Sequence, residues 1–247
     1  MKTNLTLLVS LSAVLGVAAD VVTNSWIGAD GAAWGVDSNW SANHVPTGDE
    51  YVIFPDTGSS YSINVDGDYQ VGCFYVDYRK QANGEYDMSG GSTTVVDMTL
   101  TGSGKVSATG NNTSQHCVRI NRRLVMDGPT LDLTGNEVAL LLYNGFVVNA
   151  ASHVYLCKLL LHWNGSYMNI EGGYVNVSGY TSYRASHAIR VEDGSFYSSA
   201  NLRQTDGSTG TLAFTQNGGE SSIRAVVLTA GSRLTMNGGT FKFRGAP

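Results

Sequence analysis

The sequence predicts an all-β protein that winds into a right-handed parallel β-helix, a form of β-solenoid. Three observations lead to this fold class: short runs of alternating apolar and polar residues, glycines that recur every twenty-odd residues, and few helix-forming stretches. Glycine accounts for 30 of the 247 residues and proline for only 4, which suits a chain with many tight corners. An antiparallel β-sandwich or jelly roll is the alternative that the same composition allows.

Short alternating runs define the predicted strands. Period-two alternation between turns of glycine, asparagine, aspartate and serine is typical of strands with one buried face. We expect such strands at 51–54, 61–65, 130–133, 174–177, 232–236 and 240–243. The most apolar stretch after residue 20 runs from 138 to 163 and predicts two buried strands, or one strand and a short helix.

A glycine pattern predicts how the strands stack. Residues 165–179 can be laid over residues 231–245 so that every glycine coincides, at an offset of 66. Within and between these segments, glycines follow one another at intervals of 22, 24 and 20 residues: Gly172, Gly194, Gly218 and Gly238. One such repeat cannot bury its own apolar side chains, so successive coils must stack and pair in parallel. We expect the coils to fill residues 70–247.

The chain begins and ends in segments that bear on its export and assembly. Residues 1–19 combine Lys2, an apolar stretch and small residues before Asp20, which is typical of a secretory signal peptide and predicts a secreted or cell-surface protein. No later stretch is apolar for long enough to span a membrane as a helix. The last predicted strand falls inside a repeat without a visible cap. This indicates either a fragment of a longer protein or end-to-end self-association.

The charge, the cysteines and the glycosylation motifs each limit what the chain can bind or carry. The net charge is −5 without a basic run, which argues against a nucleic-acid partner. The chain has three cysteines, whose spacing does not fit a zinc site: Cys73, Cys117 and Cys157. We expect them to be small core residues, and one disulfide is possible but cannot be assigned to a pair. Five asparagines head N-x-S/T triplets that a eukaryotic secretory route can glycosylate: Asn39, Asn111, Asn112, Asn164 and Asn176.

An aromatic block precedes the predicted coils, within residues 20–69. Its ordered positions are Trp26, Gly28, Trp34, Asn39, Trp40, Pro46 and Asp49. This block resembles the opening segment of bacterial secreted β-helix repeat proteins, which include autotransporter-like passenger regions and surface adhesins. The resemblance implies a solenoid that is secreted or displayed on the surface and acts as an adhesin or scaffold. Physically, the tryptophans are expected to cover the open apolar end of the first coil, or else to form a platform for sugars.

Chemistry-bearing residues are sparse, and two groups stand out. The first combines the cations and acids that a polysaccharide-cleaving site would need: Arg184, Arg190, Glu192 and Asp193, with His187 nearby. A surface ion pair is the simpler interpretation of this group. The second is a set of tyrosines that suits contact with glycans or proteins: Tyr167, Tyr174, Tyr180 and Tyr183, with Tyr197 close by in the sequence. No spacing predicts a metal site or a cofactor, and Asp66–Asp68 is interpreted as a corner turn rather than a calcium loop.

Three functions are compatible with these patterns. The first is a non-enzymatic extracellular solenoid, adhesin-like or scaffolding, that presents a rigid polar surface to glycans or a cell-surface protein. The second is a carbohydrate-active β-helix enzyme, either a polysaccharide lyase or a hydrolase. The third is an extracellular subunit that assembles through its open end coil. An enzyme requires carboxylates from neighbouring coils in one groove, whereas a scaffold carries scattered charges.

Overall fold

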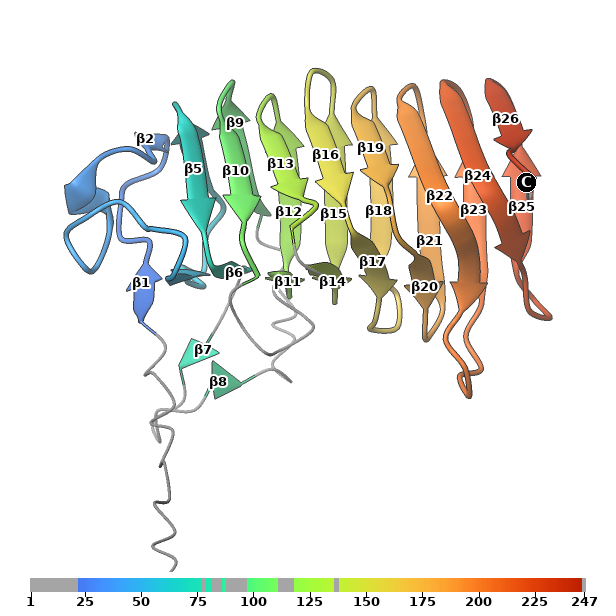
Figure 1. The fold of residues 1–247 in the computed structure, drawn as a ribbon, viewed down its shortest axis with the longest axis horizontal. Helices are drawn as coiled ribbons and strands as arrows, with labels where there is room; N and C mark the ends of the chain where they lie inside the picture. The colour runs from blue at the N-terminus through green and yellow to red at the C-terminus, as the bar shows by residue number, and fades with distance from the viewer. Residues whose placement is uncertain are drawn as a thin grey trace, which may run out of the picture.

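The molecule is a stack of β-strand coils whose axis runs from the N-terminal to the C-terminal end (Figure 1). The computed structural model describes residues 22–76, 79–80, 86–87, 97–110, 118–135 and 138–245. All pairings between named strands are parallel except that of β7 (Arg79–Lys80) with β8 (Tyr86–Asp87). The parallel β-solenoid is therefore confirmed, with about 7 turns, and the antiparallel sandwich is excluded. The right-handed winding stays a prediction, and the signal segment 1–19 lies outside the described residues.

Each middle turn contributes one strand to each of three faces. Face 1 comprises β1 (Thr23–Ser25), β3 (Tyr51–Phe54), β6 (Cys73–Val76), β11 (Val118–Ile120), β14 (Ala139–Leu142), β17 (Lys158–Leu161), β20 (Thr181–Tyr183) and the ends of β22 (Ser195–Gln204) and β24 (Glu220–Val227). Face 2 comprises β2 (Ala32–Ala33), β4 (Tyr61–Val65), β9 (Asp97–Gly102), β12 (Arg123–Asp127), β15 (Gly145–Asn149), β18 (Tyr167–Glu171), β21 (His187–Val191), β23 (Leu212–Gln216) and β25 (Arg233–Met236). Face 3 comprises β5 (Asp68–Val71), β10 (Lys105–Ala108), β13 (Thr130–Leu133), β16 (His153–Leu156), β19 (Tyr174–Val177), the starts of β22 and β24, and β26 (Thr240–Phe243).

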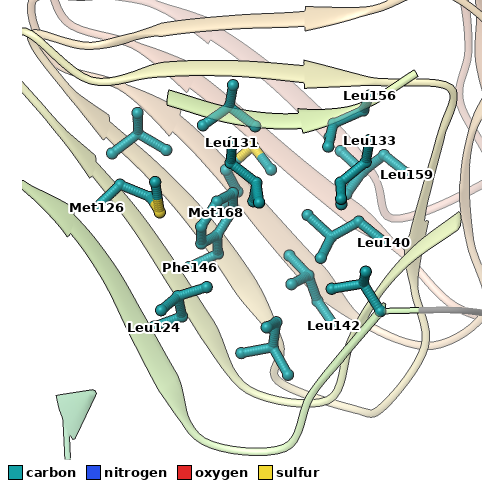
Figure 2. Packing of buried hydrophobic residues seen from close by; sticks show 14 of the residues in the cluster. Leu124, Met126, Leu131, Leu133, Leu140, Leu142, Phe146, Leu156, Leu159 and Met168 are labelled. Carbon is teal, nitrogen blue, oxygen red and sulfur yellow. The ribbon is translucent and has the colours of Figure 1, made fainter. Parts of the chain in front are cut away.

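The core consists of columns in which each turn adds one apolar side chain. On face 2, Leu124 pairs with Phe146, and Phe146 pairs with Met168 one turn further on. These side chains meet those of faces 1 and 3 in the interior, as Leu131 and Leu140 do in Figure 2. Since alternate residues point inward on every face, burial repeats with period two along most strands. The columns exclude water and so supply the main stabilisation of the fold.

The predicted strands coincide with strands of the structure in almost every case. Five of the six expected segments begin and end where predicted, and β25 begins one residue after the expected start at Ser232. The prediction for 138–163 is wrong, because this stretch forms four strands, β14 to β17, instead of two strands or a strand and a helix. The described residues contain no α-helix, only a short 3₁₀ turn at Asp37–Asn39.

The glycine pattern reflects the corner between faces 2 and 3, but three of the four expected glycines are displaced by one residue from the glycines that stack there. The amide of Ser195 donates to the carbonyl of Gly173, and the amide of Glu220 donates to the carbonyl of Gly194. In the next turn the amide of Thr240 donates to the carbonyl of Gly219. The stacked glycines are therefore Gly173, Gly194 and Gly219, followed by Gly239, and not Gly172, Gly218 and Gly238.

The aromatic block closes the N-terminal end of the solenoid. Trp26, Trp34 and Trp40 are 2%, 0% and 1% exposed, and Trp40 packs edge to face against each of the other two, with ring centroids about 5 Å apart. Trp34 also contacts Phe54 and stacks on Tyr69, which belong to the first turns. Asp66, beside this cluster, accepts hydrogen bonds from the Gly35 amide and the Tyr69 hydroxyl, as a corner residue would. The expected aromatic cap is confirmed.

The last described turn differs from the first in its exposure. Met236 and Phe243 are exposed, and Leu234 and Phe241 are only half-buried, although all four lie at positions that are buried in most earlier turns. A further layer of strands would bury these side chains. Self-association through this coil stays a prediction, and these are the residues that it would cover.

The described cysteines differ in their bonding. Cys73 is buried and disulfide-bonded, Cys157 is a free and half-buried thiol, and Cys117 lies outside the described residues. Within the part of the chain that the structure describes, no helix reaches the length and apolar character needed to cross a membrane.

Candidate functional site

The tryptophans of the cap are unavailable to a ligand, because all three are buried. A sugar platform needs an aromatic face that is open to solvent. The fourth tryptophan meets this condition, since Trp163 is 57% exposed in the loop between β17 and β18. The structure thus separates a structural role for the N-terminal block from a candidate binding role for Trp163.

The predicted cluster of cations and acids is not one site. Arg190 and Glu192 lie on the outer surface of face 2 and form an ion pair of 3.5 Å, and Glu192 also accepts a hydrogen bond from the side-chain amide of Asn217. Asp193 is exposed at the following corner. Arg184 follows β20 and lines a separate hollow on face 1. Glu192 is therefore engaged in surface contacts with Arg190 of its own turn and Asn217 of the next.

His187 and Ser166 form a buried pair that resembles a base and a nucleophile. The Ser166 hydroxyl lies 2.8 Å from Nδ1 of His187, while Nε2 accepts a hydrogen bond from the Ala185 amide at 2.9 Å. Ser166 is completely buried, so no substrate can reach its oxygen. Burial lowers the pKa of His187 from 6.5 to about 4, and the imidazole is accordingly neutral at pH 7. The pair stabilises the stack of turns and is not a catalytic site.

This buried imidazole predicts a pH dependence of stability. The unfolded chain protonates His187 near pH 6.5, whereas the folded chain resists protonation until about pH 4. The free energy of unfolding should thus fall as the pH is lowered from 6.5 to 4, with no further loss from this group below that range. We expect His187→Gln to flatten this part of the profile, as measured by urea denaturation at fixed pH values. The exposed His153→Gln serves as the control, and an equal flattening there would contradict the assignment.

The four predicted ligand tyrosines lie on different parts of the molecule. Tyr167 points outward from face 2, and Tyr174 points outward from face 3. Tyr180 lies in the connection before β20 with its ring beneath the ammonium group of Lys158, 5.7 Å from the ring centroid. Tyr183 is completely buried in a core column beside Leu161, where it cannot contact a ligand. Of the four, Tyr174 is the one that joins a larger aromatic surface.

That surface, called here the face 3 aromatic row, consists of His153, Tyr155, Tyr174 and Tyr197. Their rings belong to β16, β19 and β22, three successive turns. The ring centroids of Tyr155 and Tyr174 lie 5.7 Å apart, those of Tyr174 and Tyr197 lie 5.4 Å apart, and His153 lies 5.8 Å from Tyr174. The guanidinium of Arg244 lies 5.7 Å from the Tyr197 ring and extends the row to the later turns. The row is thus continuous over three turns of face 3.

The row also carries hydrogen-bonding groups. His153 is exposed and the three tyrosines are half-buried. Burial raises the pKa of Tyr174, so that its hydroxyl stays protonated and can donate a hydrogen bond. Asn176 lies in the same outward column, between Tyr155 and Tyr197. The surface therefore combines apolar rings with amide and hydroxyl groups, the combination that contact with sugars or polar protein surfaces requires.

Sequence reasoning missed His153 and Tyr155 as members of this surface, whereas Tyr174 and Tyr197 were among the tyrosines that it singled out. The structure pairs Tyr155 with Asn176 and Asn176 with Tyr197, at a constant separation of 21 positions. His153 and Tyr174 are separated by the same interval. A search for outward residues at this turn length, instead of tyrosines close in sequence, would have found the row.

Neither a cluster of metal ligands nor a similarity to known proteins identifies a further site in the described residues. The described part of the chain holds no group of three or more histidine, cysteine, aspartate or glutamate side chains that could hold a metal ion. The chain matches no protein-family model, no curated protein and no solved structure. Of the resemblance to bacterial secreted β-helix proteins, the strand pairing supports the parallel β-solenoid fold, and membership of that family stays a prediction.

Proposed function

We propose that the protein is an extracellular, non-enzymatic β-solenoid, adhesin-like or scaffolding, that binds glycans through the face 3 aromatic row. The observation that carries this proposal is the continuity of outward rings over three turns, with centroids 5.4–5.8 Å apart. Aromatic faces stack against the apolar faces of sugar rings, while neighbouring polar groups fix their orientation. Because the row stands on paired strands instead of loops, its spacing is held rigid before a ligand arrives.

The electrostatics of the row suit a sugar better than a strongly charged partner. Its members carry no carboxylate, ammonium or guanidinium group, and Asn176 contributes an uncharged amide between Tyr155 and Tyr197. Arg244 lies over Tyr197, and Lys242 in the same turn is paired with Glu220 at 2.8 Å. The charges around the row are thus few and largely balanced by neighbours. Affinity would be spread over several rings and hydroxyls, which is typical of a surface that binds extended chains weakly at each point.

The proposal predicts that glycan binding depends on the rings of this row. We expect the full chain to bind neutral oligosaccharides on a glycan array, and a Tyr155→Ala/Tyr174→Ala/Tyr197→Ala variant to lose at least about tenfold in affinity, equivalent to ~1.4 kcal/mol. The control is Tyr167→Ala, which removes an outward tyrosine from face 2 and should leave binding unchanged. Circular dichroism verifies that each variant is folded. Equal binding by the triple variant and the wild type would reject the proposal.

The enzymatic alternative has its own test. We expect no new reducing or unsaturated sugar ends when the chain is incubated with a panel of neutral and acidic polysaccharides. Glu192 is the best carboxylate for such chemistry among the residues predicted from the sequence, although it is paired with Arg190 and Asn217. Cleavage that disappears in Glu192→Gln would replace the proposed function with a polysaccharide lyase or hydrolase.

A further inference from the structure

The outer surface of face 1 is hollowed over the turns that contain β17, β20 and β22. The hollow has a volume of about 310 Å³, within the range of small-molecule sites. Its floor includes one column of outward residues, because Leu160 pairs with Ser182 and Ser182 pairs with Arg203. Arg184 and Asp206 line its sides. This groove, called here the face 1 groove, lies on a different face from the aromatic row.

The groove contains two unpaired cations. Arg184 and Arg203 are both exposed, and neither forms an ion pair or a side-chain hydrogen bond with the described residues. Asp206 is the single acidic residue in the lining, so the groove is locally positive although the chain carries a net charge of −5. A guanidinium presents paired donors that match the two oxygens of a carboxylate or a sulfate. Two of them in one hollow indicate an anionic ligand.

Two aromatic rings line the same groove, those of His162 and Tyr180, and further rings adjoin His162 outside the lining. His162 lines the hollow and contacts Tyr143, with 5.1 Å between ring centroids. The next residue is the exposed Trp163, whose ring lies 6.3 Å from that of Tyr143 at an angle of 30°. Tyr180 contributes another ring to the lining. Open aromatic faces beside polar groups are suited to stacking against a pyranose ring.

We infer that the face 1 groove binds an acidic sugar, with its carboxylate or sulfate on Arg184 and Arg203 and a sugar ring on Trp163. The site goes beyond the proposed function, because it lies on another face and selects for charge. Asp206 can accept hydrogen bonds from sugar hydroxyls while disfavouring a second anionic group beside it. Because the attraction is largely electrostatic at an exposed surface, binding weakens as salt is added.

The test measures binding of defined oligosaccharides to the full chain by isothermal titration calorimetry. The probes are tetragalacturonate, a sulfated galactose tetrasaccharide, and neutral tetragalactose. We expect saturable binding of at least one charged probe, and the comparison of these two identifies carboxylate or sulfate as the preferred group. Arg184→Gln/Arg203→Gln should lower that affinity at least tenfold, and Trp163→Ala should lower it as well. The double arginine variant should bind neutral tetragalactose no more weakly than the wild type does.

Matched controls separate this site from general charge and from the aromatic row. Arg233→Gln removes an exposed arginine from face 2 and should leave binding of the charged probe unchanged. The Tyr155→Ala/Tyr174→Ala/Tyr197→Ala variant should also retain it, so that failure of the proposed function would leave this inference standing. The inference is overturned if neither charged probe binds, or if the double arginine variant binds as the wild type does. It is also overturned if Arg233→Gln reduces binding equally.

Discussion

Replacing Trp34 with alanine is expected to lower the free energy of unfolding by about 3–5 kcal/mol, the range for removing a buried aromatic side chain. Trp34 is completely buried at the centre of the N-terminal cap. Its ring lies 4.9 Å from Trp40 and 5.6 Å from both Phe54 and Tyr69. Truncation removes contacts with all three rings and leaves a cavity at the end of the solenoid. Urea denaturation followed by circular dichroism measures the change.

The matched control for this substitution is Trp163→Ala, which deletes the same side chain from an exposed loop. Its effect on stability should stay within about 0.5 kcal/mol, because surface substitutions away from special contacts rarely exceed that value. The two variants thus contrast in stability and in binding: Trp34→Ala weakens the fold, and Trp163→Ala weakens the proposed acidic-sugar site. If Trp34→Ala cost no more than Trp163→Ala, the end-capping role of the aromatic block would be wrong.

Local patterning predicted the strands well where only one face of the strand is buried. β13 and β19 alternate strictly between buried and half-buried residues, and both were found with their observed bounds. The stretch 138–163 was misjudged because β14 is buried on both sides, so that its outward Leu141 is apolar as well. Period-two alternation disappears when both sides of a strand are covered, and a continuous apolar run does not reveal where one strand ends.

The candidate sites were harder to predict, because they depend on pairing between turns. Tyr180 and Tyr183 are close in sequence, yet one lies beside the face 1 groove and the other lies in the core. Tyr155 and Tyr197 are two turns apart in sequence, yet both belong to the same surface. A strand places successive side chains on opposite sides, so an error of one residue in register moves a side chain from the surface to the interior. The sequence also provided no reason to select Arg203. Its place in the groove follows from its pairing with Ser182, a residue that does not by itself indicate a binding site.

The glycine corner provides the second large effect on stability. We expect Gly194→Ala to lower the free energy of unfolding by roughly 3 kcal/mol, at the upper end of the usual cost of overpacking. A Cβ atom at this position would lie 2.3 Å from the carbonyl oxygen of Gly173 and 2.5 Å from a methyl group of Ile170. The carbonyl of Gly173 is fixed because it accepts the Ser195 amide at 2.8 Å. The turns would have to move apart to make room, and the midpoint of urea denaturation reports the loss.

Gly207→Ala is the control that separates crowding from backbone conformation. Gly207 has a φ of +75° with nothing within 4 Å of an added Cβ atom, so alanine there meets only the conformational penalty of about 1–2 kcal/mol. Gly194 is the reverse case, because its φ lies outside the left-handed region and only its neighbours exclude a side chain. A cost at Gly194 no larger than that at Gly207 would show that the corner tolerates a wider spacing.

The spacing of this corner also connects stability with the proposed binding surface. Gly173 and Gly194 directly precede Tyr174 and Ser195, the paired residues with which two turns of face 3 begin. If alanine at Gly194 pushes these turns apart, the distance between the rings of Tyr174 and Tyr197 must change as well. A folded Gly194→Ala variant should therefore bind glycans more weakly than the wild type, whereas Gly207→Ala should bind equally well. Glycine at this corner thus determines both how tightly the turns stack and how closely their outward rings follow one another.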